Sequence, residues 1–167
     1  MKNRHVTYPV LAAIAGAAVA VTALATPGSG VLSAPVLARA SFVDPVDMKI
    51  KIGDGRQEVL HIPDARESIV QQIIISPGGQ TGWHSHPGPV IVLIKTGAMT
   101  FYDGDDPTCS PITYSAGQSF IDSGQGHVHI AWNESASVDL ELWALYLDVP
   151  PAGAFRIDAP APGNCAF

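Results

Sequence analysis

The sequence is poor in charged residues, and in basic residues above all. Its 167 residues include nine Lys and Arg against 15 Asp and Glu, and charged residues make up 14% of the chain. No stretch combines a basic patch with interleaved aromatic residues. A negatively charged surface repels both nucleic acid and anionic lipid. The composition therefore excludes nucleic acid as a partner.

The chain also lacks helical periodicity. Outside the N-terminal region, no segment sustains an apolar period of 3.6 residues. Short apolar and β-branched runs alternate instead with Gly, Pro and Asp turn signals. The predicted strands are residues 47–52, 68–76, 90–96, 98–102, 119–122, 128–132 and 138–149. Short strands separated by tight turns predict an all-β barrel or sandwich in a single domain.

Cysteine is scarce, and no glycine-rich phosphate loop or local Ser-His-Asp or Cys-His signature occurs. The two cysteines are Cys109 and Cys165. In an exported protein an even pair of cysteines is more often bridged than free, so we expect a disulfide between them. The alternative, a thiol ligand or nucleophile, would need a neighbouring base that neither loop suggests.

The first 40 residues differ in composition from the rest. Lys2 and Arg4 precede an apolar, Ala-rich run at residues 10–25, and residues 23–25 (ALA) and 38–40 (ARA) both fit a small-x-small cleavage site. This pattern predicts a secretory signal. An uncleaved membrane anchor is the alternative, although the run is shorter and less apolar than the roughly 20 residues of a spanning helix.

These features predict a signal peptide with a processing or linker segment at residues 1–40 and one domain at residues 41–167. Three basic residues lie in the first segment, so 9 − 3 = 6 remain against all 15 acidic residues. The mature chain is then near −9, which favours solubility. We expect an exported, extracytoplasmic protein.

Four of the six histidines form two His-x-His pairs: His84 with His86, and His127 with His129. Side chains alternate across a strand, so residues i and i+2 point to the same face. Imidazole is a neutral, borderline-soft ligand suited to Zn, Cu, Fe or Ni. Two pairs that converge from two strands would hold such an ion.

The spacing around the first pair resembles the first motif of the cupin superfamily. That motif is Gly, five residues, His-x-His, three or four residues, Glu, six residues, Gly. Here Gly78, His84, His86 and Gly97 fall in place, but Val90 stands where the family has its Glu.

The second pair lies in a stretch that resembles the family's second motif, Gly, five residues, Pro-x-Gly, two residues, His, three residues, Asn. Gly126, His129 and Asn133 fit it, whereas Gly117 sits one residue too early and Gly124 replaces the Pro. The likeness covers about half of the predicted domain and is that of a small, single-domain, exported bacterial cupin.

The resemblance implies a jelly-roll barrel, also called a double-stranded β-helix. Carried over residue by residue, it makes His84, His86 and His129 metal ligands, and it offers no carboxylate. The alternation of side chains along a strand adds His127 as a fourth candidate ligand. An open three-histidine site and a closed four-histidine site are therefore the two alternatives. A vacant barrel with hydrogen-bonded histidines is the third alternative. The glycines of the motifs and Asn133 are expected to be structural.

Two functions fit these expectations. The first is a metal-dependent oxygenase, isomerase or lyase acting on a small polar molecule, with Zn, Cu or Fe as cofactor and an anionic or enolate-like substrate favoured. The second is a non-catalytic barrel that binds a small ligand or a metal. A histidine-only site predicts metal release as the pH falls near about 6.5. Cupins often pair through sheet edges, so a homodimer is compatible with the sequence.

A cluster of acidic residues, Asp103, Asp105 and Asp106, follows the predicted strand 98–102. It lacks the spacing and the terminal Glu of an EF-hand calcium loop. We interpret it as an acidic hairpin turn.

Overall fold

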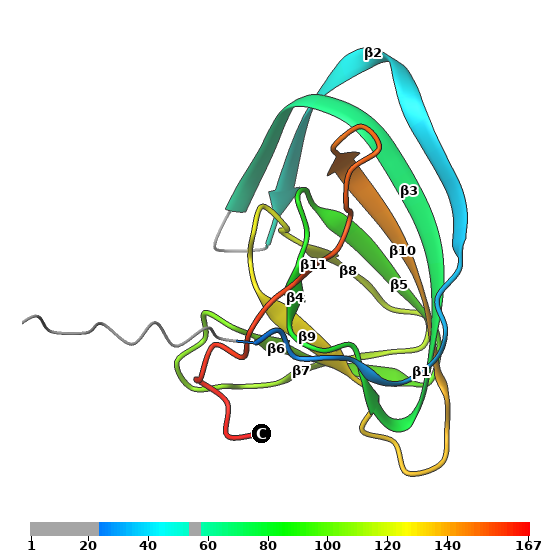
Figure 1. Cartoon of the computed structure of the whole chain (residues 1–167), viewed down its shortest axis with the longest axis vertical. Coiled ribbons are helices and arrows are strands. Elements are labelled where there is room, and N and C mark those ends of the chain that lie inside the picture. Colours follow the sequence, from blue (N-terminus) through cyan, green and yellow to red (C-terminus); the bar gives the residue numbers. More distant parts are fainter. Residues whose placement is uncertain (1–23, 54–57) are drawn as a thin grey trace, which may run out of the picture.

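The computed structural model describes residues 24–53 and 58–167, and every regular element in these ranges is a strand (Figure 1). The strands are β1 (Ser29–Ser33), β2 (Val36–Ile52), β3 (Glu58–Gln80), β4 (His84–Ser85), β5 (Val90–Thr96), β6 (Ala98–Asp103), β7 (Ile112–Ser115), β8 (Ser119–Asp122), β9 (His129–Trp132), β10 (Leu140–Val149) and β11 (Ile157–Asp158). The predicted all-β class is confirmed. In the described ranges, nothing folds into a helix that could cross a membrane. The predicted leader lies outside them as far as residue 23.

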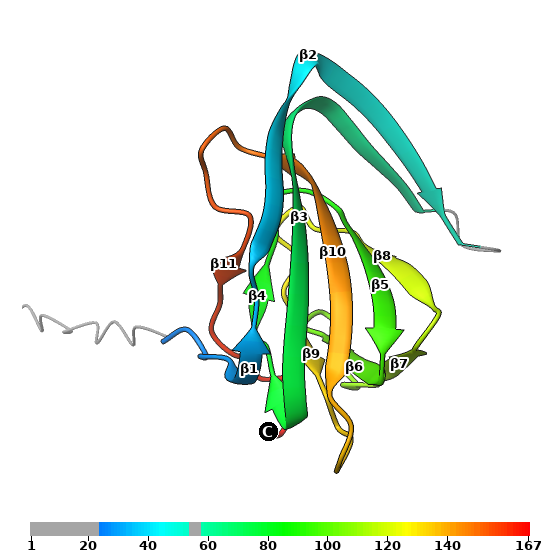
Figure 2. The same cartoon turned by 90° about the vertical axis from the view of Figure 1, so that its right-hand side faces the viewer.

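The strands form one antiparallel sheet that curls into a nearly closed barrel (Figure 2). Neighbouring strands run β2-β3-β10-β5-β8 along one side and β11-β4-β9-β6-β7 along the other. The two sides meet where Gln80 of β3 pairs with Trp132 of β9. This closure brings β4 and β9, which carry the histidine pairs, into contact.

The barrel interior is filled by the inward-facing residues of alternating strands. In β10, Leu140, Leu142, Ala144 and Tyr146 are buried, whereas Trp143 between them is 37% exposed. This period of two is the pattern that a strand with one buried face must have. The core as a whole consists of Ile69, Ile75, Val90, Val92, Ile94, Met99, Phe101, Ala131, Leu140, Leu142, Ala144, Tyr146 and Val149.

The predicted boundary at residue 40 is wrong, because β1 and the start of β2 belong to the barrel. Both strands pair with β3, where Ala38 lies opposite Val70 and Ala40 opposite Ser68. Arg39 between them forms an ion pair of 2.6 Å with Glu67. Most of the predicted linker is therefore strand, although its composition (TPGSG, SAP) is typical of turns.

The hairpin of β2 and β3 is longer than predicted and arches above the barrel (Figures 1 and 2). Pro45, Pro63 and Pro77 lie inside these strands. Proline and glycine usually end a strand, but here β2 and β3 continue past them with shifts in register. This hairpin, the arm, contacts the barrel where Gln125 Nε2 donates to the carbonyl of His61, at 3.3 Å.

Candidate metal centre

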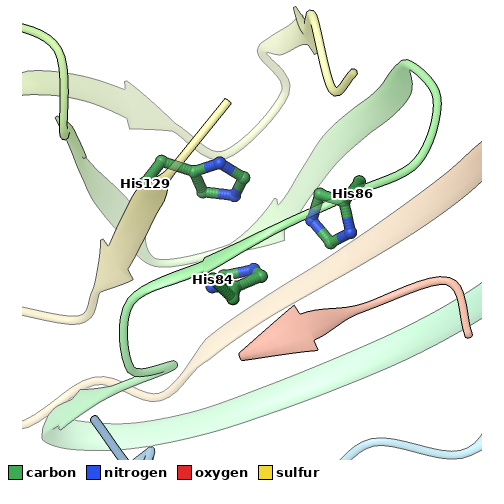
Figure 3. A group of neighbouring side chains, drawn as sticks. All are labelled: His84, His86 and His129. Carbon is green, nitrogen blue, oxygen red and sulfur yellow. The ribbon is translucent and has the colours of Figure 1, made fainter. Parts of the chain in front are cut away.

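Three of the predicted histidines lie together inside the barrel, because the strands that carry two of them pair with each other. His84 of β4 lies directly opposite His129 of β9 in the antiparallel register. Directly opposed residues point to the same face of a sheet. His86 follows directly after β4, and its ring lies beside that of His84. Figure 3 shows the three rings turned toward one another.

The three imidazoles form a compact group. The ring centroids are 4.4 Å apart for His84 and His129, 4.9 Å for His84 and His86, and 5.2 Å for His86 and His129. One ring nitrogen from each residue lies within 4.8 Å of the corresponding nitrogens of the others. This is a donor set that a single ion can reach.

Backbone carbonyls fix the tautomers of two of these rings. His84 Nδ1 lies 2.8 Å from the carbonyl oxygen of Gly82, and His86 Nδ1 lies 2.6 Å from that of Phe155. A carbonyl only accepts, so each Nδ1 must carry the proton and donate it. Each Nε2 is therefore left unprotonated, with its lone pair free for a ligand. Metal-bound histidines usually have this arrangement.

Burial keeps the three histidines neutral. Each is no more than 5% exposed. Burial, together with the neighbouring histidines, lowers the pKa of His84 well below its usual value, that of His86 to about 4 and that of His129 to about 3. Protons therefore compete with a metal well below the range near 6.5 that an exposed histidine would give, which corrects the pH range predicted above.

A carboxylate that the sequence did not reveal also faces this group. Asp122, the last residue of β8, is 4% exposed. Its Oδ2 lies 4.0 Å from His86 Nε2 and its Oδ1 lies 3.7 Å from His129 Nδ1. Asp122 is paired with Val90 in the β5–β8 register. His84, His86 and His129 form a group of histidines alone, and this carboxylate beside them comes from the strand next to Val90, the residue where the cupin motif has its Glu.

Asp122 is poorly satisfied by the protein alone. Its Oδ1 accepts a hydrogen bond from the backbone N–H of Gly124, at 3.3 Å. Its Oδ2 and the Nδ1 of His129 are buried and have no hydrogen-bond partner among the described residues. Burial raises the pKa of Asp122, an effect that the nearby His86 reduces. A buried carboxylate oxygen without a partner is costly, and a cation beside it would remove that cost.

His127 does not join the three-histidine group. The strand begins at His129, so the parity that was expected to align the two residues does not apply. His127 Nε2 lies instead 3.1 Å from Asp103 Oδ1 and 3.3 Å from Asp105 Oδ2, at the acidic turn after β6. It also lies near Asp122 and His129. The closed four-histidine version is thus not the arrangement that the chain adopts.

The remaining motif residues shape the backbone around the barrel. Gly78, Gly97 and Gly126 all have positive φ. At Gly97 (φ 76°) a Cβ would also come within 2.8 Å of the carbonyl oxygen of Asp139, so a side chain is excluded there by both conformation and space. Asn133 is fully buried, and its Nδ2 donates to the carbonyls of Ile75 and Val138, at 2.9 Å each. Asn133 thereby joins the end of β9 to β3 and β10.

The two cysteines form a disulfide that closes the C-terminal tail onto the acidic turn. Beside this bridge, the amide of Asn164 donates to the carbonyls of Asp103 and Asp106, at 2.9 and 2.7 Å. The tail therefore supports the turn that holds His127. A disulfide is typical of an oxidising, extracytoplasmic environment.

The cavity at the three histidines is small. It measures about 40 Å³ and is lined mostly by apolar core residues, with Asp122 and the histidines as its polar part. A water molecule takes up roughly 30 Å³ of liquid volume. The cavity is therefore large enough for an ion or a water molecule, but not for an organic substrate.

No protein-family model and no curated protein matches this chain. Solved structures with similar folds include a cupin-like protein from Thermotoga maritima (TM-score 0.46, 18% identity, 56% of this chain and 65% of that one). A cupin domain from Bordetella pertussis gives 0.42 and 18%, over 65% of this chain and 99% of that one. A protein of Klebsiella pneumoniae with a double-stranded β-helix domain gives 0.44 and 19%, over 72% and 88%.

These three solved structures carry the names of cupin or double-stranded β-helix proteins. The chain spans 65% of the length of the Thermotoga protein. At these identities the likeness concerns the fold and nothing beyond it. The chemistry of the site follows from the chain's own residues.

Proposed function

We propose that the protein binds one transition-metal ion through His84, His86 and His129, with the carboxylate of Asp122 beside it, and uses the ion in a reaction on a small polar molecule. The observation that carries this proposal is the donor set itself. Three buried, neutral imidazoles converge, and two of them have their protons held on the far nitrogen by backbone carbonyls. Packing alone does not require that arrangement.

The donor set fits a borderline transition metal better than a hard cation. Imidazole suits Zn, Cu and Fe, whereas Mg²⁺ and Ca²⁺ prefer shells made of oxygen. One carboxylate among three imidazoles would neutralise part of the charge of a divalent ion. Asp122 Oδ2 and His129 Nδ1, two of the buried atoms without partners in the described part of the chain, are the groups that a bound cation would compensate.

Such an ion would supply Lewis acidity to a bound oxygen atom of the substrate, and with Fe or Cu also a redox centre. The protein's own part is to hold and to orient. The carbonyls of Gly82 and Phe155 fix the rings of His84 and His86. The apolar lining, including Phe101, Phe120 and Leu142, limits the access of water. An oxygenase or an isomerase is compatible with this design.

The alternative is a barrel that holds a metal or a small ligand without catalysis. The size of the interior cavity favours it, because about 40 Å³ leaves no room for an organic substrate next to the histidines. In this version the ion is retained for structural or storage reasons. Access to the ion from outside the cavity decides between the two, and exogenous ligands such as azide or nitric oxide measure it.

We also propose that the protein is exported and is processed after Ala25. Thr26 is anchored to the barrel, since its Oγ1 accepts from the backbone N–H of Trp83 at 2.9 Å and its N–H donates to the carbonyl of Ala159 at 3.0 Å. Cleavage after Ala40 would remove β1 and part of β2. N-terminal sequencing of the exported protein tests this directly: Thr26 is expected as the first residue, and Ser41 would contradict it.

The function is tested by elemental analysis of the mature protein, purified without metal-affinity resin. His84→Ala and His127→Ala are analysed beside the wild type. We expect near-stoichiometric metal in the wild type and in His127→Ala, and its loss in His84→Ala. Retention of the metal in His84→Ala would contradict the assignment. A wild type that stays free of metal after reconstitution would leave a ligand-binding barrel without a metal.

A further inference from the structure

A second, larger pocket adjoins the histidine group. It measures about 400 Å³ and shares Ile73, Thr81, His84 and Tyr146 with the interior cavity, so these residues form the wall between the two. Sites for small molecules usually measure about 300–1,000 Å³. A small organic molecule therefore fits in this pocket, although it does not fit in the cavity that the histidines enclose.

The pocket is built from segments that strand pairing brings to His84. Asp158 of β11 lies directly opposite His84 of β4. This pairing places Arg156, two residues earlier, at the same pocket. Phe155, the residue before it, accepts the hydrogen bond from His86 Nδ1. The segment that carries Arg156 is thus held by two of the proposed metal ligands.

Arg156 is the one permanently cationic residue among the described residues that line the pocket. Its Nε donates to Asp158 Oδ1 at 2.8 Å, and its Nη2 donates to the carbonyl of Thr81 at 2.6 Å. A guanidinium has five N–H donors in a planar fork. These two bonds leave the other three without a partner in the described part of the chain.

The balance of charge leaves the guanidinium available to a ligand. The side chain of Asp158 is 59% exposed and that of Arg156 is 31% exposed. Water therefore weakens the pair between them, while Arg156 faces the half-buried pocket. An arginine with spare donors at the wall of such a pocket is suited to a carboxylate, which matches its planar fork.

The back wall of the pocket is polar but already satisfied. Tyr146 donates its hydroxyl proton to Gln71 Oε1 at 2.7 Å, and Gln71 Nε2 donates to the carbonyl of Ala34 at 2.8 Å. These groups fix the shape of the pocket and contribute little further donor capacity. The specificity of the pocket therefore depends on Arg156.

We propose that this pocket binds a small organic acid, whose carboxylate pairs with Arg156 and whose opposite end reaches the wall formed by His84 and Tyr146. The inference rests on the proposed function, because it supplies the place from which a substrate would approach the metal. It names the substrate class: a small, polar molecule with at least one carboxylate. The N-terminal segment helps to close the pocket through Pro27, Gly28 and Val31.

The test is calorimetric titration of the metal-loaded mature protein with malonate, with the uncharged malonamide and with inorganic phosphate. Arg156→Gln is compared with Arg66→Gln, a matched change in an exposed ion pair with Asp64 on the arm. We expect malonate to bind the wild type and Arg66→Gln equally, and to bind Arg156→Gln about ten- to hundredfold more weakly. Malonamide and phosphate are expected to bind poorly.

Equal binding of malonate by Arg156→Gln and the wild type would overturn the proposal. So would equal binding of malonamide or phosphate, or no binding of malonate up to tens of millimolar. Arg156→Lys, which keeps the charge without the fork, is expected to be intermediate and replaces Arg156→Gln if that variant does not fold. Metal content is measured on the same samples. Full metal without malonate binding refutes the pocket alone, and Arg156-dependent binding without metal refutes the metal centre alone.

Discussion

His127 and His129 stand two residues apart, yet they belong to groups with opposite properties. His129 lies in the buried group with His84, His86 and Asp122, in which each residue is no more than 5% exposed. The side chains of the exposed group, His127 with Asp103 and Asp105, are 24%, 36% and 78% exposed. Both groups contain imidazoles and carboxylates that could ligate a metal.

The difference suggests a criterion for a metal centre in which burial counts for more than residue type. In the exposed group, the carboxylates lie within 3.3 Å of His127 Nε2, and water solvates the remaining oxygens. Such ion pairs contribute little free energy. In the buried group, the described residues leave a carboxylate oxygen as well as an imidazole nitrogen without partners, whereas in the exposed group the buried atom without a partner is His127 Nδ1. The buried group, with its unpaired carboxylate oxygen, therefore gains more from a cation.

The largest expected effect is on the free energy of unfolding, and it comes from removing the disulfide. The disulfide supports only the exposed group. Cys109 and Cys165 are separated by 56 residues, and a closed loop of that size stabilises by up to about 4 kcal/mol. The double variant Cys109→Ser, Cys165→Ser should lose stability of this order in denaturant unfolding. Its metal affinity should stay within about twofold of the wild type. Loss of the metal would show that the two groups are not independent.

The next effect is the acid sensitivity of the metal-free protein. Below pH 6.5 the unfolded chain takes up protons on histidines that stay neutral in the fold, since the pKa of His86 is about 4. The unfolded state then binds more protons, so stability falls as the pH falls. For His86 the full contribution to the free energy of unfolding is about 3 kcal/mol, and more than half of this contribution is lost by about pH 5.

Urea unfolding of the metal-free wild type and of His86→Gln between pH 6.5 and about 5 measures this contribution. The slope of stability against pH should be shallower in His86→Gln. His61→Gln is the matched control, because His61 lies on the exposed arm. Equal slopes in all three proteins would contradict the picture of a buried, neutral histidine.

A smaller effect, on metal affinity, distinguishes the carboxylate of Asp122 from that of Asp105. Asp122→Asn should weaken metal binding about ten- to hundredfold, and Asp105→Asn should change it by less than about twofold. Because burial already raises the pKa of Asp122, the metal-free Asp122→Asn variant should be at least as stable as the wild type. Isothermal titration and thermal unfolding measure both quantities. Unchanged affinity in Asp122→Asn would remove this carboxylate from the centre.

The register of β5 and β8 offers a rescue experiment. Val90 is paired with Asp122, and both face the interior cavity. Val90→Glu in the Asp122→Asn background should restore part of the lost affinity, since it moves the carboxylate to the neighbouring strand. Leu93→Glu, on the exposed face of β5, is the control and should restore nothing. Equal affinities in both double variants would show that the carboxylate acts only through its charge.

Local patterns predicted much of the fold and part of the site. Alternation predicted strands such as β5 and β10, and the spacing of His84 and His86 predicted that they lie together, although β4 ends at Ser85. Asp122 was missed because its place depends on which strands pair and in what register, and local sequence does not contain that information. Its only signal was a carboxylate at the inner end of a short apolar strand, SFID.

Two errors have the same physical origin, which is that strand boundaries depend on tertiary pairing and not on the local sequence alone. His127 was predicted to face the same way as His129 from the alternation of side chains along a strand, whereas the strand begins only at His129. Residues 26–40 were predicted to be a linker or processing segment from their Gly, Pro and Ser content, although pairing with β3 makes Ser29–Ser33 and the chain from Val36 onward strand. In both cases tertiary pairing overrode the local pattern.

The most direct measurement is an anomalous difference map from crystals of the metal-loaded protein, collected at the absorption edge of the metal that elemental analysis identifies. We predict one peak among His84, His86 and His129, within bonding distance of Nε2 of His84 and His86 and of one ring nitrogen of His129, and on the side of Asp122. A peak between His127 and the two exposed carboxylates, with none at the buried group, would contradict the account.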